Sequence, residues 1–114
     1  MPTSMHNLQR LEGAIGLCLR AGRCVTGTQA CQEAIRRGEA LLVLIDPSAS
    51  AATVDQWEDM CRYYGADFRH LPEEEMLSRL SGRENRRIAA VTDPGFAGMI
   101  GKLLPVSNKT HGGA

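Results

Sequence analysis

Apolar residues recur along this chain with two different spacings, and the two spacings alternate. Runs of apolar residues at 41–45 and 88–92 are typical of strands buried on both faces of a sheet. Shorter β-prone segments at 24–26 and 67–70 are further strand candidates. Elsewhere apolar residues recur every three or four positions, which predicts helices that begin near residues 8, 28, 50, 72 and 94. A helix followed by four strand–helix pairs predicts an α/β fold with helices on both faces of one sheet.

Glycine, proline and acidic residues mark the ends of these predicted helices. Gly22 and Gly65 suit the left-handed conformation that ends a helix. Pro72 and the three glutamates after it are typical of a helix start, with proline first and acids in the first turn. Asp93 is expected to cap the last helix, with Pro94 as its first residue.

The aromatic residues are few, and the sequence assigns most of them to the core. The apolar face of the third predicted helix consists of Val54, Trp57, Cys61 and Tyr64. Tyr63, Tyr64 and Phe68 all lie in or beside predicted core positions. The sequence therefore does not favour an exposed aromatic platform for stacking bases.

The 114 residues and 12.4 kDa of the chain fit a single domain. We expect residues 1–104 to fold together and the polar segment 105–114 to lack fixed structure. No stretch approaches the roughly 18 apolar residues of a membrane span. The first residues lack the order of a signal peptide. We therefore expect a cytoplasmic protein without a membrane partner, and the oligomeric state stays open.

The residues that could carry catalysis or bind metal form no recognisable constellation. The cysteines at positions 18, 24, 31 and 61 make no Cys-x-x-Cys pair, so we expect small buried side chains and no metal site. No histidine stands in a recognisable pairing with a cysteine. The chain has no Walker loop and no dinucleotide-binding fingerprint. We expect a protein that is not an enzyme and uses no cofactor.

Charge is sorted along the chain, although the formal net charge is zero. Eight of the eleven arginines lie in two windows, 20–37 and 79–87. Each window contains one acid, so eight positive charges stand against two negative ones, a sum of +6, and the rest of the chain carries −6. This sorting predicts a local basic surface, which suits a phosphate-rich partner.

The first window surrounds a turn between a strand and a helix. Gly27 permits a tight turn, after which the N–H groups of residues 28–30 are expected to face an anion. The side-chain amide of Gln29 can both donate to and accept from a purine edge. Arg20 and Arg23 lie just upstream. An ordinary helix start with solvated arginines explains these residues equally well.

The second window is a polar loop, residues 81–87, that leads into a buried-type strand. Its arginines suit backbone phosphates and stacking on unpaired bases. A solvated surface loop is again an equally weighted alternative.

Several segments, in order, carry a family likeness. They are Arg20-Ala21-Gly22-Arg23, Thr26-Gly27, Ala34-Ile35-Arg36-Arg37-Gly38 and Leu42-Val43-Leu44-Ile45. Together they resemble the ribosomal protein superfamily of the L7Ae/L30e type, which binds kink-turn RNA. Residues 61–64, 82–86 and 90–97 resemble its bacterial YlxQ-like branch. The resemblance covers residues 8–104 and keeps the order of all elements.

The resemblance implies a three-layer α-β-α sandwich with a mixed four-stranded sheet. It also implies that structured RNA binds one edge, built by the start of the second helix and the loop before the last strand. The implied RNA-binding residues, with the upstream arginines of the first window, are Arg20, Arg23, Gly27, Thr28, Gln29, Ala30, Glu33, Arg36, Arg37, Gly82, Arg83, Glu84, Asn85 and Arg86.

Three positions depart from the family pattern. Kink-turn binders typically have Asn-Glu where this chain has Gln29-Ala30, and that pair reads tandem sheared G·A pairs. A family lysine falls where Glu33 stands, and a carboxylate repels phosphate. We therefore expect structured RNA as the partner, with ribosomal RNA as a candidate, rather than specific kink-turn recognition. The alternative is a protein-interaction module that kept the fold and lost the RNA surface.

Overall fold

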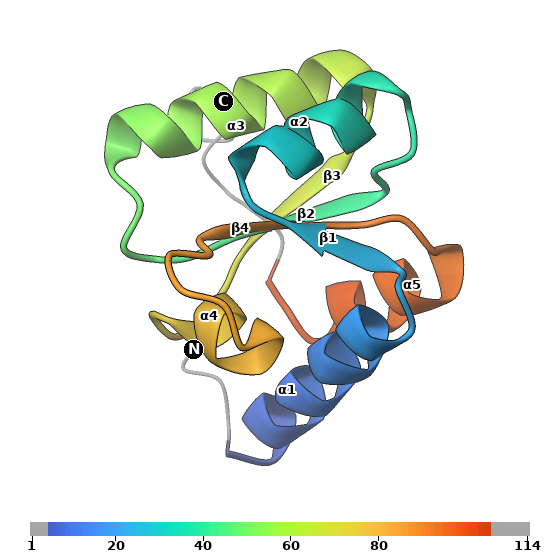
Figure 1. The fold of residues 1–114 in the computed structure, drawn as a ribbon, viewed down its shortest axis with the longest axis vertical. Coiled ribbons are helices and arrows are strands. Elements are labelled where there is room, and N and C mark those ends of the chain that lie inside the picture. Colours follow the sequence, from blue (N-terminus) through green and yellow to red (C-terminus); the bar gives the residue numbers. More distant parts are fainter. Residues whose placement is uncertain (1–4, 106–114) are drawn as a thin grey trace.

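The computed structural model describes residues 5–105, which form five helices and one four-stranded sheet in the predicted alternating order (Figure 1). The elements are α1 (Met5–Arg20), β1 (Cys24–Thr26), α2 (Thr28–Arg36), β2 (Leu42–Ile45), α3 (Ala51–Tyr64), β3 (Asp67–His70), α4 (Met76–Ser81), β4 (Ile88–Val91) and α5 (Pro94–Lys102). The segment 105–114, which we expect to lack fixed structure, lies outside the described residues apart from Pro105. Within residues 5–105, no helix combines the length and the apolar content of a membrane span.

The sheet is mixed and has the strand order β1-β4-β2-β3. β4 runs antiparallel to both of its neighbours, whereas β2 and β3 are parallel. The two central strands, β2 and β4, are buried along their whole length, as their apolar runs predict. One end of the sheet therefore carries the ends of β1, β2 and β3 beside the start of β4.

Helices cover both faces of the sheet, so the expected three-layer sandwich is confirmed. α1, α4 and α5 lie on one face, and α2 and α3 lie on the other (Figure 1). Successive side chains of each strand point to opposite faces of the sheet, so each strand contributes to two separate cores. Leu42 and Leu44 pack with the first group of helices, and Val43 and Ile45 pack with the second.

The helix ends predicted at Gly22, Gly65 and Asp93 are confirmed. Gly22 and Gly65 adopt left-handed backbone angles, with φ of 72° and 83°, where a side chain would be strained. The Asp93 carboxylate accepts a hydrogen bond from the Phe96 N–H at 3.0 Å and caps α5. Such a cap stabilises a helix by about 1 kcal/mol.

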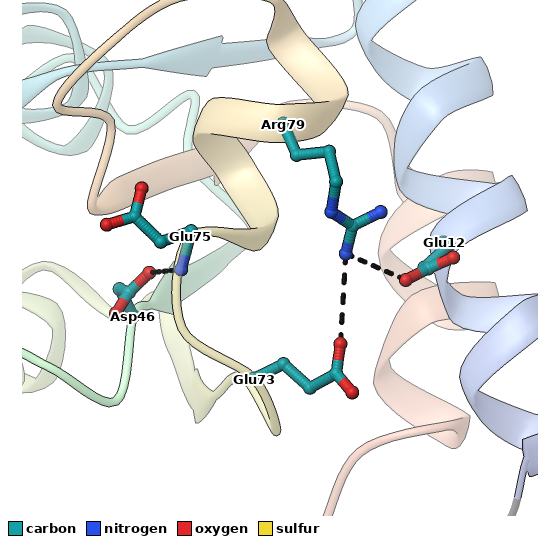
Figure 2. Close-up of polar contacts among 5 residues, drawn as sticks. All are labelled: Glu12, Asp46, Glu73, Glu75 and Arg79. Carbon is teal, nitrogen blue, oxygen red and sulfur yellow. Dashed lines mark hydrogen bonds and ion pairs between the residues drawn. The ribbon is translucent and has the colours of Figure 1, made fainter.

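The predicted helix start at Pro72 is wrong. α4 begins at Met76, because Glu75 takes a left-handed conformation with φ of 69°, which a right-handed helix cannot include. The Glu75 N–H donates instead to Oδ2 of Asp46 at 2.8 Å (Figure 2). A contact with the loop that follows β2 therefore overrides the local helix-start signal.

The predicted burial is correct for two aromatic residues and wrong for two others. Trp57 and Phe68 are buried, whereas Tyr63 is 82% exposed and Tyr64 is 43% exposed. The helix period places Tyr64 on the flank of α3 and Tyr63 on its outer side, since Cys61 marks the buried centre. All four cysteines are buried, as expected.

Candidate nucleic-acid interface

The two arginine windows meet at Gly27. The Gly27 N–H donates to the carbonyl of Ile88 at 3.1 Å, which ties the β1–α2 turn to the start of β4. Nη1 of Arg86 donates to the Thr26 carbonyl at 3.4 Å and occupies the space where a Cβ on Gly27 would project. Gly27 has a φ of 96°, which side chains rarely adopt. The backbone angle therefore requires glycine here, and a Cβ would in addition displace the Arg86 guanidinium from its place.

A hydrogen bond to Ser78 of α4 holds the loop between α4 and β4 in place. The Ser78 hydroxyl accepts this bond from the Arg86 N–H at 2.9 Å. The loop turns at Gly82 and at Asn85, which have φ of 72° and 59°. Arg83 lies between these two turns and is exposed, whereas Arg86 is half-buried. The loop thus holds one arginine in the fold and presents another to solvent.

The start of α2 leaves backbone donors without helical partners. Its N-cap is Gly27, which has no side chain to bond the first N–H groups. In a helix the N–H groups of the first turn, here Thr28, Gln29 and Ala30, have no carbonyl partner within the helix. Thr28 and Gln29 are exposed. This turn can therefore offer N–H groups and partial positive charge to an anion.

Two hollows flank the Gly27 turn. One, of about 530 Å³, lies between the starts of α2 and α3, and its lining includes Thr28, Trp57, Asn85 and Arg87. The other, of about 470 Å³, follows the edge strand β1, and its lining includes Arg20, Thr26, Ala30 and Arg83. Arg20 and Arg83 come from different windows, and the fold brings them to the same hollow.

The structure does not bring all the predicted residues to this place, and the expectation of one continuous edge needs correction. Arg23 precedes β1 at the other end of the sheet, where its carbonyl accepts from the Thr92 N–H at 3.0 Å. Arg36 and Arg37 lie at the far end of α2. With a rise of 1.5 Å per residue, Arg36 is about 12 Å along the helix from its start. Glu33 is exposed between the two ends.

Arg79 of the second window is held by acids. Its Nη2 lies 2.9 Å from Oε2 of Glu12 on α1 and 3.8 Å from Oε1 of Glu73 (Figure 2). This arginine links α4 to α1, so its charge is partly neutralised before any partner binds.

The comparisons with known proteins agree with this architecture. The family model of the ribosomal protein L7Ae/L30e/S12e/Gadd45 family matches residues 9–100. The RNA-binding protein YlxQ of Bacillus subtilis is 37% identical over 90 residues, which is 79% of this chain and 90% of that protein. The protein of the same name from Enterococcus faecium is 30% identical, over 86% of this chain and 94% of that protein. The chain belongs to the L7Ae/L30e/S12e/Gadd45 family.

Solved structures extend the likeness. A protein of unknown function from Bacillus halodurans C has a TM-score of 0.76 and 26% identity, covering 82% of this chain and 95% of that one. A Giardia lamblia 15.5kD RNA binding protein has a TM-score of 0.68 at 13% identity, covering 90% of this chain and 88% of that one. At that identity the second likeness shows the fold alone.

In this member of the L7Ae/L30e/S12e/Gadd45 family, sequence reasoning missed two residues near the Gly27 turn, Trp57 and Arg87. Trp57 was assigned only to the core, yet it also lines the hollow between α2 and α3. Arg87 lies in the second window but outside the predicted site, and it lines the same hollow. For Arg87 the available signal was its position directly before the buried strand β4, because residues next to the ends of buried strands gather at one end of a sheet.

Proposed function

We propose that this chain binds structured RNA through the Gly27 edge, by which we mean Arg20, residues 27–30 and the loop 82–86. The observation that carries the proposal is the hollow beside β1, where Arg20 and Arg83 face the same space next to the free start of α2. Within residues 5–105 neither arginine side chain has an ion pair or a hydrogen bond that would occupy it. The two relatives named as RNA-binding proteins support the same partner.

Each part of the Gly27 edge has a distinct task in this proposal. Arg20 and Arg83 contact backbone phosphates, which position RNA without reading its sequence. The N–H groups of residues 28–30 receive a phosphate or a base edge. The hollow lined by Trp57, Asn85 and Arg87 accepts an unpaired base, since its volume and its mixed lining suit a flat polar ring.

The RNA we propose is structured but is not a standard kink-turn. Gln29 retains an amide that can contact a base edge, but Ala30 has no polar atom on its side chain. Two of the residues with which relatives of this type read sheared G·A pairs are thus replaced, and Glu33 adds a carboxylate one turn away. Ribosomal RNA is the first set of structured RNAs to test.

A binding role fits the chemistry of the thiols better than a catalytic role. A hydrogen bond with Cys18 and burial raise the pKa of Cys24, and the same hydrogen bond lowers the pKa of Cys18, which is fully buried. Burial raises the pKa of Cys31 to about 12 and that of Cys61 to about 12. A nucleophilic cysteine needs an accessible thiolate. We place the proposed activity in the cytoplasm, where structured RNA is available.

Salt dependence of RNA binding tests the proposal. The probe is fragmented total bacterial RNA, titrated with the full chain in a filter-binding assay at several salt concentrations. Contacts to two phosphates give a slope of log K against log salt of about −1.5 to −2. An affinity that does not change with salt would refute the electrostatic part of the model.

Arg83→Ala is the informative variant, because Arg83 is exposed. Its loss leaves the hydrogen bonds of Arg86 with Ser78 and with the Thr26 carbonyl intact. We expect weaker binding to all structured RNAs and a salt slope reduced by about one. Arg10→Ala is the matched control, since Arg10 is an exposed arginine of α1 outside both windows. If neither the wild-type chain nor the variants bind RNA while the chain co-purifies with a protein, the protein-interaction alternative replaces this proposal.

A further inference from the structure

The Gly27 edge is assembled from two segments that lie far apart in the sequence. One segment is the turn and first residues of α2, residues 27–30, and the other is the loop 82–86 between α4 and β4. One ligand can contact both segments only if they keep a fixed relative position. A side chain that holds the two segments together can therefore control binding without touching the ligand.

The Arg86 side chain joins the two segments. Its Nη1 donates to the carbonyl of Thr26, which lies 60 positions earlier in the sequence, at 3.4 Å. The same nitrogen occupies the place that a Cβ on Gly27 would take. The flat guanidinium thus lies directly against the backbone of the turn. Arg86 carries this contact from the end of the loop to the start of α2.

The Arg86 guanidinium is poorly placed to bind a phosphate. Its Nε is buried and has no hydrogen-bond partner among residues 5–105, and its Nη1 is bonded to Thr26. Each of the two forks that a guanidinium offers to a phosphate uses Nε or Nη1. Arg86 is also half-buried, whereas Arg83 is exposed. The guanidinium of Arg86 is therefore placed to support the turn, and that of Arg83 to face RNA.

Ser78 of α4 sets the position of Arg86. Its hydroxyl accepts a hydrogen bond from the Arg86 N–H at 2.9 Å and donates to the Arg86 carbonyl at 3.4 Å. The Ser78 carbonyl accepts from the Gly82 N–H at 3.0 Å. Ser78 thus holds the first and the last residue of the loop 82–86, and Arg83 lies between them.

We propose that Arg86 and Ser78 are positioning residues for RNA binding at the Gly27 edge. Arg86 holds the start of α2 against the loop, and Ser78 holds Arg86. Together they keep the backbone donors of the α2 start and the Arg83 guanidinium at the spacing that one RNA requires. The resemblance implies that Arg86 contacts RNA, whereas here it acts through the Gly27 turn. The role rests on the proposed function, because it concerns the same site.

The physical basis of this role is preorganisation of the loop. The loop contains Asn85 with φ of 59°, a left-handed angle that is strained for a residue with a side chain. Without the hydrogen bonds to Ser78, the loop relaxes towards other conformations. RNA must then order the loop again, and this ordering lowers the affinity. One lost hydrogen bond corresponds to a loss of about 2- to 12-fold.

Ser78→Ala is the first test, in filter binding of the full chain to fragmented total bacterial RNA. The variant keeps every arginine, and alanine favours the helical conformation of α4. We expect affinity to fall about 2- to 12-fold with an unchanged salt slope, because no phosphate contact is lost. Thr92→Val is the matched control. It removes a 3.2 Å hydroxyl-to-carbonyl bond with Arg23, at the other end of β1, and should leave affinity unchanged.

Two substitutions of Arg86 separate positioning from direct phosphate contact. Arg86→Lys keeps the positive charge but loses the flat guanidinium that lies against Gly27. We expect it to lose affinity as Arg86→Ala does, and neither variant should change the salt slope. Ser78→Ala combined with Arg86→Ala should lose little more than the weaker single variant, because both act through the same contacts. A slope reduced by about one in Arg86→Ala, with recovery in Arg86→Lys, would overturn the proposal.

Hydrogen exchange gives a readout that needs no RNA. The Gly27 N–H donates to the Ile88 carbonyl at 3.1 Å, and its exchange can be followed by NMR. We expect this exchange to be faster in Ser78→Ala and in Arg86→Ala than in the wild-type chain. Binding is compared well below the melting temperature of each variant, so unfolding does not contribute.

The two proposals fail in different ways. A wild-type chain that binds no RNA refutes the proposed function, and the positioning role falls with it. A wild-type chain that binds RNA no more tightly than Ser78→Ala and Arg86→Ala overturns the positioning role alone. Unchanged exchange of the Gly27 N–H in both variants also overturns that role and leaves the proposed function standing.

Discussion

Replacing Asp46 with asparagine tests how the loop after β2 holds α4 in place. Asp46 is 1% exposed. Its Oδ1 accepts from the Ser48 N–H at 2.8 Å and from the Ser48 hydroxyl at 2.7 Å, and its Oδ2 accepts from the Glu75 N–H at 2.8 Å (Figure 2). Asparagine has nearly the same shape but turns one acceptor into a donor. One of the two backbone N–H groups must then face another donor.

The magnitude follows from these contacts. A hydrogen bond to a charged group contributes about 1.5–3 kcal/mol, and an unsatisfied buried donor costs a similar amount. Asparagine keeps one oxygen acceptor, so one or two of the three hydrogen bonds are lost. We expect Asp46→Asn to lower the free energy of unfolding by about 2–4 kcal/mol. With a urea m-value of about 1.5 kcal/mol per M, the midpoint falls by roughly 1.3–2.7 M.

The effect of pH has a definite sign. Burial raises the pKa of Asp46, but hydrogen bonds from Ser48 and from the Glu75 N–H, with the charge of Arg87, lower it by more. The net pKa in the folded state is therefore below the ordinary value of about 3.9. Such a group stabilises the fold above that ordinary pKa, and the stabilisation is lost as the pH falls through the folded pKa. The difference between wild type and Asp46→Asn should narrow below about pH 4.

The assay is urea unfolding followed by circular dichroism at neutral and acidic pH. Asp59→Asn is the matched control, because the Asp59 side chain is 72% exposed and its ion pair with Arg62 is solvated. We expect its midpoint to move by less than the equivalent of about 0.5 kcal/mol. An unchanged midpoint for Asp46→Asn at neutral pH would refute the argument. So would a difference that widens as the pH falls.

Four further variants test the site and its supports. Gly27→Ala should lower the melting temperature by the equivalent of about 1–3 kcal/mol and weaken RNA binding, because of its positive φ and the guanidinium beside it. Gly98→Ala, in an exposed helical position with open space, should instead raise the melting temperature by the equivalent of about 0.5–1 kcal/mol. Arg79→Ala should lower the free energy of unfolding in urea by less than about 1 kcal/mol and leave RNA binding unchanged, since its partners are surface acids. Gln29→Asn with Ala30→Glu should raise affinity for a kink-turn hairpin in filter binding, and a hairpin without its G·A pairs should show no gain.

Local signals were sufficient for most of the fold. β1 and β3 begin and end at the predicted residues, because Gly22 and Gly27 flank β1, and Gly65 and Pro72 flank β3. α4 is the exception. Pro72 and its glutamates satisfy every local rule for a helix start, yet the Asp46 carboxylate takes the Glu75 N–H from 29 residues away. A tertiary contact of that kind has no signature in the residues around Pro72.

The meeting of the two windows required information that local patterns do not contain. Gly27 and Arg86 lie together because β1 pairs with β4, and strand order cannot be read from periodicity. The family resemblance implied only that the start of the second helix and the loop before the last strand share one edge. The separation of Arg36 from Gly27, in contrast, could have been predicted. A nine-residue helix is about 13 Å long, so residues at its two ends cannot share one small contact surface.

Counting charges in a sequence window overestimates the basic surface that the window provides. Arg79 is engaged by two carboxylates, and Arg86 is half-buried against the Gly27 turn. Of the four arginines in the second window, Arg83 and Arg87 are exposed and have no ion pair within residues 5–105, and they lie beside different hollows. An arginine is thus available to RNA only where the fold leaves its guanidinium without a partner. That condition, rather than the density of arginine, separates Arg83 from Arg86 three residues later.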